Sequence, residues 1–351
     1  MNEKRSACRR NLNATVAKMH AVYGRRLRQE DYNALLSCTS VSDAADYLKR
    51  STYFSKVLEN VNTESIHRGN LENILRRSLM ERYFQILRFE KIAENEFYNF
   101  IIIKTEIDEI LICILHLNAG TSDHINTLPI YMNKYTSFNL MELAKVGSYA
   151  ELLALTEKTP YSAILKKYQP DEKGHIDYPA LELELNTYYS RRLADSLKLI
   201  GGETEKRLRD FIGSQIDMKN IINSYRMKRF FNADAEDIRS RMIPIYMRIS
   251  QQKMDELYNA RDDKEFMQRF SQTYYGREIA AKGFDMSDPE TALIRFRYLQ
   301  IKRAFSRSTA APECFYTFIQ LADIEVKNII RIIEGIRYSL PTKEISELII
   351  T

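Results

Sequence analysis

The polar residues best placed to do chemistry in this sequence recur at regular positions. Asp217, Asn220 and Ser224 stand at i, i+3 and i+7, so they share one side of a predicted helix. Glu325 and Asn328 repeat the first two of these positions 108 residues later. A carboxylate and an amide on one side can brace a neighbouring segment, as buried polar groups must be paired. They can also line a cavity that several equivalent faces share. The two interpretations are compatible, and both stay open here.

Familiar catalytic and ligand-binding patterns are missing from the sequence. It contains neither of the two common glycine-rich phosphate motifs. Its five histidines form no pair with metal-ligand spacing, and Asp123-His124 has no serine or cysteine in a nucleophile elbow. The four cysteines are scattered without a C-x-x-C pair, which is typical of reduced, idle thiols. We therefore expect no catalytic residue, no cofactor and no metal.

Two independent markers, an acidic residue in a recurring run and a threonine near a tyrosine, indicate that the chain contains three sequence repeats. An Ile-Pro element that occurs twice supports them. Leu128-Pro129-Ile130-Tyr131-Met132 returns as Ile243-Pro244-Ile245-Tyr246-Met247. Asp217 and Glu325 stand in matching runs, and a weaker copy begins at Ile107-Asp108. The second marker is a threonine with a tyrosine within two residues; it occurs at Thr52, Thr159 and Thr273. We predict three repeats, with domains at residues 1–120, 121–235 and 236–351.

Length and composition favour long helices over hairpins. A chain of 351 residues exceeds the size at which one hydrophobic core stops growing. With 11 glycines and 8 prolines, few tight turns are available. We predict an all-α protein of three pseudo-symmetric helical-bundle domains, each with short helices before a threonine–tyrosine corner and two long helices after it.

Hydrophobic periodicity places the longer helices. It predicts helices over 70–91, 178–199, 289–305 and 312–338. Ser287 and Glu290 are spaced as a capping box for the third of these. Residues 97–104 have β-branched character, but their flanks are helical and we predict helix there as well. Residues 203–206, after Gly201-Gly202, are predicted to be a loop.

The charge is mildly basic and concentrates near the amino end. The net charge is +5, and the basic residues of this segment are Lys4, Arg5, Arg9, Arg10, Lys18, Arg25, Arg26 and Arg28. Such a segment could be an organelle transit peptide, or it could bind nucleic acid or anionic lipid. We favour a basic helix end that meets an acidic partner or water. No apolar run approaches the roughly 20 residues needed to span a bilayer.

Several motifs in order resemble those of one family. Tyr23-Gly24-Arg25-Arg26-Leu27-Arg28, Ile176-Asp177-Tyr178-Pro179-Ala180 and Asp217-Met218-Lys219-Asn220-Ile221 with Arg226 are similar to segments of the V-type ATPase d-subunit family. In bacterial and archaeal A/V-type enzymes its members are called the C subunit. Glu325-Val326-Lys327-Asn328-Ile329 resembles the family's closing stretch. The sequence departs from the family pattern in Tyr-Met after both Ile-Pro elements and in Leu111, where the other repeats carry asparagine.

The resemblance implies a funnel of three helical domains around a central cavity. It implies a non-catalytic central-stalk subunit of a rotary V/A-type ATPase, peripheral on the cytoplasmic face of the membrane and not a homo-oligomer by itself. Its partners would be the central shaft subunits and the membrane rotor ring, and its role would be to link ATP hydrolysis or synthesis to H⁺ or Na⁺ transport. Cavity or partner contacts would fall on Arg25, Arg28, Asp217, Asn220, Ser224, Arg226, Glu325 and Asn328.

Two other classes of function remain as alternatives. A helical-repeat scaffold could bind a peptide or nucleic acid, although such repeats usually run about 20 to 50 residues. An all-helical enzyme could hold a site between domains, although no catalytic constellation is visible. Co-purification separates the three classes, because they predict shaft and ring subunits, salt-sensitive nucleic acid, or turnover by the isolated protein. We expect no nucleic acid.

Overall fold

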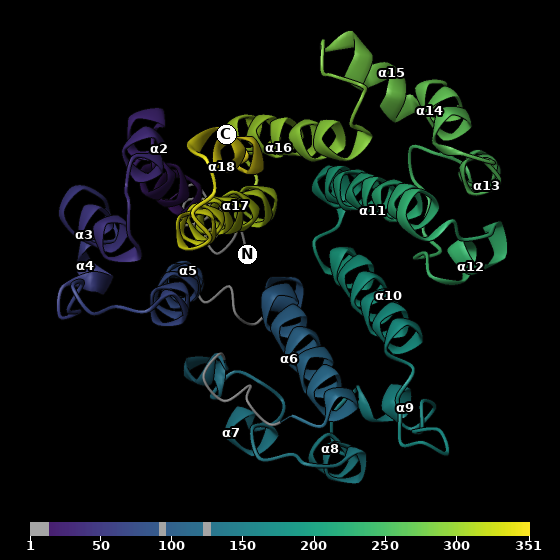
Figure 1. Cartoon of the computed structure of the whole chain (residues 1–351), viewed down its shortest axis with the longest axis horizontal. Helices are drawn as coiled ribbons and strands as arrows, with labels where there is room; N and C mark the ends of the chain where they lie inside the picture. Colours follow the sequence, from purple (N-terminus) through teal and green to yellow (C-terminus); the bar gives the residue numbers. More distant parts are fainter. Residues whose placement is uncertain (1–13, 91–95, 122–127) are drawn as a thin grey trace, which may run out of the picture. The chain divides into compact units, whose positions relative to one another are not determined.

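The structure is a computed structural model that describes residues 14–90, 96–121 and 128–351. Throughout these residues the regular elements are helices, and no strand occurs among them (Figure 1). The predicted all-α class is therefore confirmed. The basic residues Lys4, Arg5, Arg9 and Arg10 lie outside the described residues, as does the pair Asp123-His124.

The chain divides into two compact units, and the first joins its two ends. Unit 1 contains residues 1–94 and 300–351, and unit 2 contains residues 95–299. Residues 14–23 of unit 1 are helical. Its further helices are α2 (Gln29–Leu36), α3 (Val41–Ser51), α4 (Ser55–Leu58), α5 (Arg68–Glu90), α17 (Ala311–Arg337) and α18 (Thr342–Leu348). α16 (Pro289–Arg307) begins in unit 2 and ends in unit 1.

The core of unit 1 lies between the long helices α5 and α17 and the short helices that cover them. α5 and α17 pack along each other, and α18 folds back on α17 (Figure 1). Leu71 and Leu75 of α5 meet Ile329 and Ile333 of α17 in one buried cluster. Leu48 of α3 is buried in the same cluster, which places α2, α3 and α4 as a cap on the pair. Residues from both ends of the chain thus share one hydrophobic core.

Unit 2 contains two bundles that follow the same plan. Its 3₁₀ elements are η2 (Glu96–Asn99), η4 (Ile130–Met132) and η5 (Leu197–Leu199). Its long helices are α6 (Phe100–Ala119), α10 (Tyr178–Ser196) and α11 (Gly202–Phe231). Its short helices are α7 (Leu140–Leu143), α8 (Tyr149–Leu155), α9 (Ser162–Leu165), α12 (Ala235–Ser240), α13 (Gln251–Tyr258), α14 (Asp263–Ser271) and α15 (Tyr274–Ala281).

In the first bundle of unit 2, α6 and α10 pack along each other and α9 contacts α10 (Figure 1). In the second, α13 and α14 pack against α11. Ile221 of α11, Phe266 and Phe270 of α14 and Phe296 of α16 belong to one buried cluster. Burying large aromatic side chains of this kind contributes about 1.5–3 kcal/mol each relative to exposure. The second bundle therefore has its own apolar core beneath its short helices.

Most predicted helices are confirmed, and two local predictions are wrong. α5, α10, α16 and α17 match the predicted ranges, and residues 97–104 fall in η2 and α6. Residues 203–206 belong to α11 and are no loop, because Gly201 and Gly202 make the turn with φ of 68° and 63°. The cap before α16 is Asp288, which accepts the N–H of Glu290 at 3.1 Å. Ser287 donates instead to Asp285.

The three-domain division at 120/121 and 235/236 and the funnel around a cavity stay predictions. Among the described residues, no helix is both long enough and apolar enough to cross a membrane.

Gly276 in α15 provides a test of how tightly these caps are packed. A Cβ added there would lie 2.7 Å from the Cα of Ser271 and against the carbonyl of Phe270. We expect Gly276→Ala to lower the free energy of unfolding by about 1–3 kcal/mol because backbone atoms must shift. Urea unfolding of the purified chain measures this.

Gly69 in α5 is the matched control for that substitution. It lies in a helix, and a Cβ there would meet nothing within 4 Å. Gly69→Ala should be neutral or stabilising by up to about 1 kcal/mol. Equal losses for the two variants would contradict the close approach at Gly276.

Candidate functional site

Asp217 is the best-connected polar group on α11. Its side chain is fully buried, with 0% exposure. It accepts the backbone N–H of Met247 at 3.0 Å and of Arg248 at 2.7 Å, and the hydroxyl of Tyr275 donates to it at 2.8 Å. Burial raises the pKa of Asp217, and these donors counteract the rise. Burial and the adjacent carboxyl also raise the pKa of Tyr275, so the phenol stays protonated and donates. Asp217 therefore ties α11 to the 247–248 segment and to α15.

Asn220 anchors the same loop one turn further along α11. Its Nδ2 donates to the carbonyl of Ile243 at 2.8 Å, and its Oδ1 accepts the N–H of Ile243 at 3.2 Å. The side chain is 1% exposed. Ser224 is also buried, but its hydroxyl bonds within the helix, to the carbonyl of Ile221 at 2.9 Å. The bracing interpretation is thus confirmed for Asp217 and Asn220. The hydroxyl of Ser224 instead bonds within its own helix and holds no neighbouring segment.

Unit 1 repeats both anchors on α17. Glu325 accepts the N–H of Leu27 at 2.8 Å and a short hydrogen bond from the hydroxyl of Tyr53. Asn328 donates to the carbonyl of Ile350 at 2.6 Å and accepts its N–H at 2.9 Å. Desolvation raises the pKa of Glu325 above its ordinary value. In unit 2 one continuous segment, residues 243–248, bonds to both anchors. In unit 1 two separate segments take its place, with Leu27 bonded to Glu325 and Ile350 bonded to Asn328.

The third anchor is Glu106, and the sequence alignment of the first repeat was wrong by two residues. Glu106 accepts the hydroxyl of Tyr161 at 2.6 Å and a short bond from the N–H of Ser137. Asp108, which the prediction aligned with Asp217, has a side chain 47% exposed and pairs with Lys104 at 2.6 Å. Glu109 rather than Leu111 therefore stands where the other repeats carry asparagine. The signal was ambiguous because α6 carries three acids in four residues. The structure buries Glu106 and Glu109, leaves Asp108 partly exposed, and gives the Tyr161 hydroxyl to Glu106.

The threonine corners explain why each acid has a tyrosine. Thr273 Oγ1 accepts the N–H of Gly276 at 3.1 Å and begins α15. Thr159 Oγ1 accepts the N–H of Tyr161 at 3.3 Å, and Thr52 Oγ1 accepts that of Phe54 at 3.2 Å. Each corner aims its tyrosine at a buried carboxyl group. The two sequence markers that recur in step therefore meet as one hydrogen bond, which we call the brace: Tyr53–Glu325, Tyr161–Glu106 and Tyr275–Asp217.

The predicted arginine contacts do not belong to the brace hydrogen bonds. Arg226 is exposed on α11 and forms an ion pair with Glu290, with Nε 2.8 Å from Oε2. Arg25 and Arg28 are exposed in unit 1, and the backbone N–H of Arg28 donates to Asp31 at 2.7 Å. Their side chains remain accessible, so a partner contact stays a prediction for these three residues.

The braces offer no reaction centre. Each buried carboxyl accepts a tyrosine hydroxyl and at least one backbone N–H, so it is committed to structure. In the part of the chain that the structure describes, no group of three His, Cys, Asp or Glu residues could hold a metal ion. Burial raises the pKa of Cys113 and of Cys314 to about 12, which makes both thiols poor nucleophiles at neutral pH.

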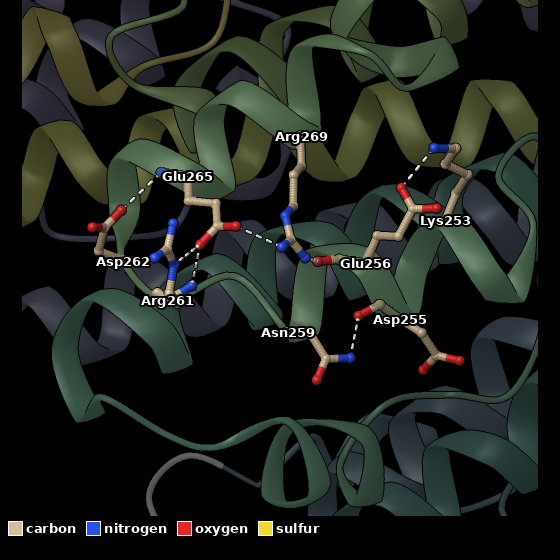
Figure 2. Close-up of polar contacts among 8 residues, drawn as sticks. All are labelled: Lys253, Asp255, Glu256, Asn259, Arg261, Asp262, Glu265 and Arg269. Atoms are coloured by element: carbon tan, nitrogen blue, oxygen red, sulfur yellow. Dashed lines mark hydrogen bonds and ion pairs between the residues drawn. The ribbon is translucent and has the colours of Figure 1, made fainter.

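A surface network stiffens the cap formed by α13 and α14 (Figure 2). Glu265 accepts the N–H of Arg261 at 2.9 Å, the Nε of Arg261 at 2.8 Å and an Nη of Arg269 at 2.5 Å. Arg269 also donates to the carbonyl of Glu256 at the end of α13. These bonds and charges lower the pKa of Glu265 from 4.5 to about 2. The network joins two short helices of the same bundle.

Comparison with known proteins finds one family. The model of the ATP synthase (C/AC39) subunit family matches residues 15–348. The C subunit of the A-type ATP synthase of Methanosphaera stadtmanae is 20% identical over 343 residues, which cover 95% of this chain and 86% of that protein. Its counterpart in Thermococcus onnurineus is 23% identical, covering 95% and 88%. That of Thermococcus kodakarensis is 24% identical, covering 65% and 60%.

Substitutions in the Asp217 brace test its contribution to stability. Asp217→Ala leaves the backbone N–H groups of Met247 and Arg248 without this acceptor and leaves the Tyr275 hydroxyl with the carbonyl of Ser214 alone, and we expect a loss of about 1–3 kcal/mol. Tyr275→Phe removes one donor and should cost about 1 kcal/mol. Because the two groups share one bond, the double variant should lose less than the sum. Chemical denaturation of the three variants gives the coupling energy.

Asp108→Ala is the control for this prediction. Asp108 is exposed, so its substitution should change the free energy of unfolding by no more than about 1 kcal/mol. Glu106→Ala should resemble Asp217→Ala. A larger loss for Asp108→Ala than for Glu106→Ala would contradict the register found in the structure.

The lowered pKa of Glu265 predicts a pH dependence. Its folded-state pKa of about 2 lies below its ordinary value of 4.5, so its ionised form stabilises the fold. That stabilisation is complete above about pH 4.5 and is lost as the pH falls toward 2. We expect Glu265→Gln to be less stable than the wild type at pH 6 and equal to it near pH 2. Urea unfolding at several pH values measures the difference, and a gap that stays constant over this range would refute the assignment.

Proposed function

Because this chain belongs to the ATP synthase (C/AC39) subunit family, we propose that it is the socket through which a rotary ATPase turns its membrane ring. The chain is a subunit of that kind of complex and is not itself an enzyme. The proposal adds the position of the chain between the central shaft and the rotor ring. It receives the end of the central shaft and passes torque to the rotor ring, so that ATP hydrolysis or synthesis is linked to H⁺ or Na⁺ transport.

The repeated brace is the observation that carries the proposal. A part that passes torque must resist bending and needs no reaction centre. In each bundle the brace joins a capping corner to a long helix through a buried charge-assisted hydrogen bond. The asparagine anchors hold a loop to the same helices at Ile243 and Ile350. Close-packed cores with polar anchors of this kind deform little under load.

Equivalent bundles also favour a socket. Three copies of one plan placed about an axis leave a central opening, and we propose that the shaft end enters there. Domains at 1–120, 121–235 and 236–351 remain the proposed units of this symmetry. The exposed Arg25, Arg28 and Arg226 would meet acidic surfaces of the shaft subunits or the ring. Cations on a protein beside the cytoplasmic face of a membrane are also compatible with anionic headgroups.

Removing the chain from its complex tests the coupling role. In membranes from cells that lack it, we expect the detached catalytic head to retain ATP hydrolysis while ATP-driven ion uptake into inverted vesicles is abolished. Adding back the purified chain should restore uptake. The assay follows ATP turnover together with both a pH gradient and Na⁺ uptake, since the ring decides which ion moves.

Two results would count against the proposal. Loss of hydrolysis in the isolated head would give the chain a catalytic role. Full ion uptake without the chain would make it dispensable for coupling. Co-purification of nucleic acid in place of shaft and ring subunits would instead favour the helical-repeat scaffold.

A further inference from the structure

Unit 1 contains a groove that the braces do not use. It lies between the first turns of α5 and the loop that joins α4 to α5, both of which are seen in Figure 1. Its volume is about 390 Å³. Sites that bind ligands commonly have volumes of about 300–1,000 Å³. The groove is therefore large enough to receive part of another molecule.

The floor of the groove is apolar, and its rim carries amide and hydroxyl groups. Val61, Ile66 and Ile74 form the floor; they are half-buried and pack against the core of unit 1. The exposed residues of the rim are Asn62, Ser65 and Asn70. None of the residues that line the groove carries a charge. The groove therefore suits a segment that is uncharged, with polar groups for the rim and an aliphatic group for the floor.

The loop side of the groove is held in place from α3. Lys49 Nζ donates to the carbonyl of Val61 at 2.9 Å, and the hydroxyl of Ser42 donates to the carbonyl of Thr63 at 2.8 Å. A groove whose walls are fixed before binding loses little conformational entropy when it is occupied. These bonds therefore favour binding without forming any contact with the occupant.

The amide group of Asn70 has no partner in the protein. Asn70 is exposed, and among the described residues no hydrogen bond engages its side chain. An asparagine amide donates through its nitrogen and accepts through its oxygen. Asn70 can therefore give an occupant one donor and one acceptor side by side.

Three other asparagines show what such an amide binds in this chain. Asn118 of α6 donates to the carbonyl of Ile176 at 2.9 Å and accepts the N–H of the same residue at 2.9 Å. Asn220 and Asn328, described above, make the same pair of bonds. In all three cases the partner is an isoleucine that lies outside the helices, so its backbone groups are free to pair. An asparagine on a long helix thus binds the backbone of a non-helical segment.

We propose that the groove binds an extended, uncharged segment of a shaft subunit. The backbone of this segment pairs with the amide of Asn70, and an aliphatic side chain of the segment lies over Ile66 and Ile74. This inference rests on the proposed function and gives it a contact distinct from the exposed arginines. Helices that cross a bilayer satisfy their backbone groups internally, so the segment belongs to the soluble shaft and not to the rotor ring. Nucleic acid would require cations that the groove lacks.

Cross-linking from the rim of the groove identifies the occupant. Ser65→Cys places a thiol there, and a maleimide–benzophenone attached to it forms a bond to nearby C–H groups on irradiation. In the intact ATPase we expect mass spectrometry to find the link on an uncharged stretch of a shaft subunit. The unsubstituted chain corrects for labelling of the native cysteines. Links to the rotor ring or within this chain alone, or no link, would overturn the inference.

Ser55→Cys is the control for the cross-link. Ser55 is exposed on α4 in the same unit and does not line the groove. A benzophenone attached there should not reach the stretch that is linked from position 65. The same stretch linked equally from both positions would contradict a segment held in the groove.

Binding of the purified chain to the purified shaft subunits measures the contribution of Asn70. Asn70→Ala removes the donor and the acceptor, and we expect binding about five- to tenfold weaker. The loss should be the same at low and high salt because no charge is involved. Asn70→Asp removes the donor and puts a charge into the uncharged groove, so it should weaken binding at least as much. Thermal unfolding confirms that each variant folds.

Asn33→Ala is the matched control, since Asn33 is an exposed helical asparagine of the same unit that does not line the groove. It should bind as the wild type does. Equal affinity of Asn70→Ala and the wild type would overturn this inference while leaving the socket intact, and so would a loss that disappears at high salt. Failure of the wild-type chain itself to bind the shaft subunits would instead remove the proposed function and this inference together.

Discussion

A buried carboxyl group that accepts a tyrosine hydroxyl and a loop N–H is the interaction on which this structure depends. Burying a carboxyl group costs free energy. The fold tolerates each of these groups because their oxygen atoms accept hydrogen bonds from nearby donors. Asp217 accepts from two backbone donors and a phenol, and removing its carboxyl group leaves the two backbone N–H groups without this acceptor in the protein interior. The need for hydrogen-bond donors arises at one carboxyl group, yet meeting it joins three separate chain segments. It therefore specifies how the cap sits on the long helix as well as stabilising it.

The same device works at very different separations along the chain. Tyr161 reaches Glu106 across 55 residues and Tyr275 reaches Asp217 across 58. Tyr53 reaches Glu325 across 272. The first two braces close shorter loops, whereas the third brings the two ends of the chain into one unit. Closing this longer loop costs more conformational entropy, although the cost grows slowly with loop length. The shared core of α5 and α17 offsets that entropy, since it buries leucine and isoleucine side chains from both ends.

Repetition also explains which positions are free to serve a partner. The face that carries Asp217 and Asn220 is consumed by internal hydrogen bonds in every bundle. The opposite side of the same helices carries charge, and that side differs between repeats. In a complex of unlike subunits, recognition has to break the symmetry of the repeats. Variation at equivalent positions on that side achieves this without altering the braces.

The sequence by itself determined the helical class, the long helices and the existence of a repeated acid and a repeated threonine corner. These follow from local chemistry: the 3.6-residue period, the scarcity of glycine and proline, and side chains that cap helices. Only the tertiary structure decided that the two markers touch, that Glu106 and not Asp108 is the acid of the first repeat, and that Tyr53 pairs with Glu325. Burial made those choices. Among several acids on one helix, the one that finds donors in the core is set by packing between distant segments, which no local pattern encodes.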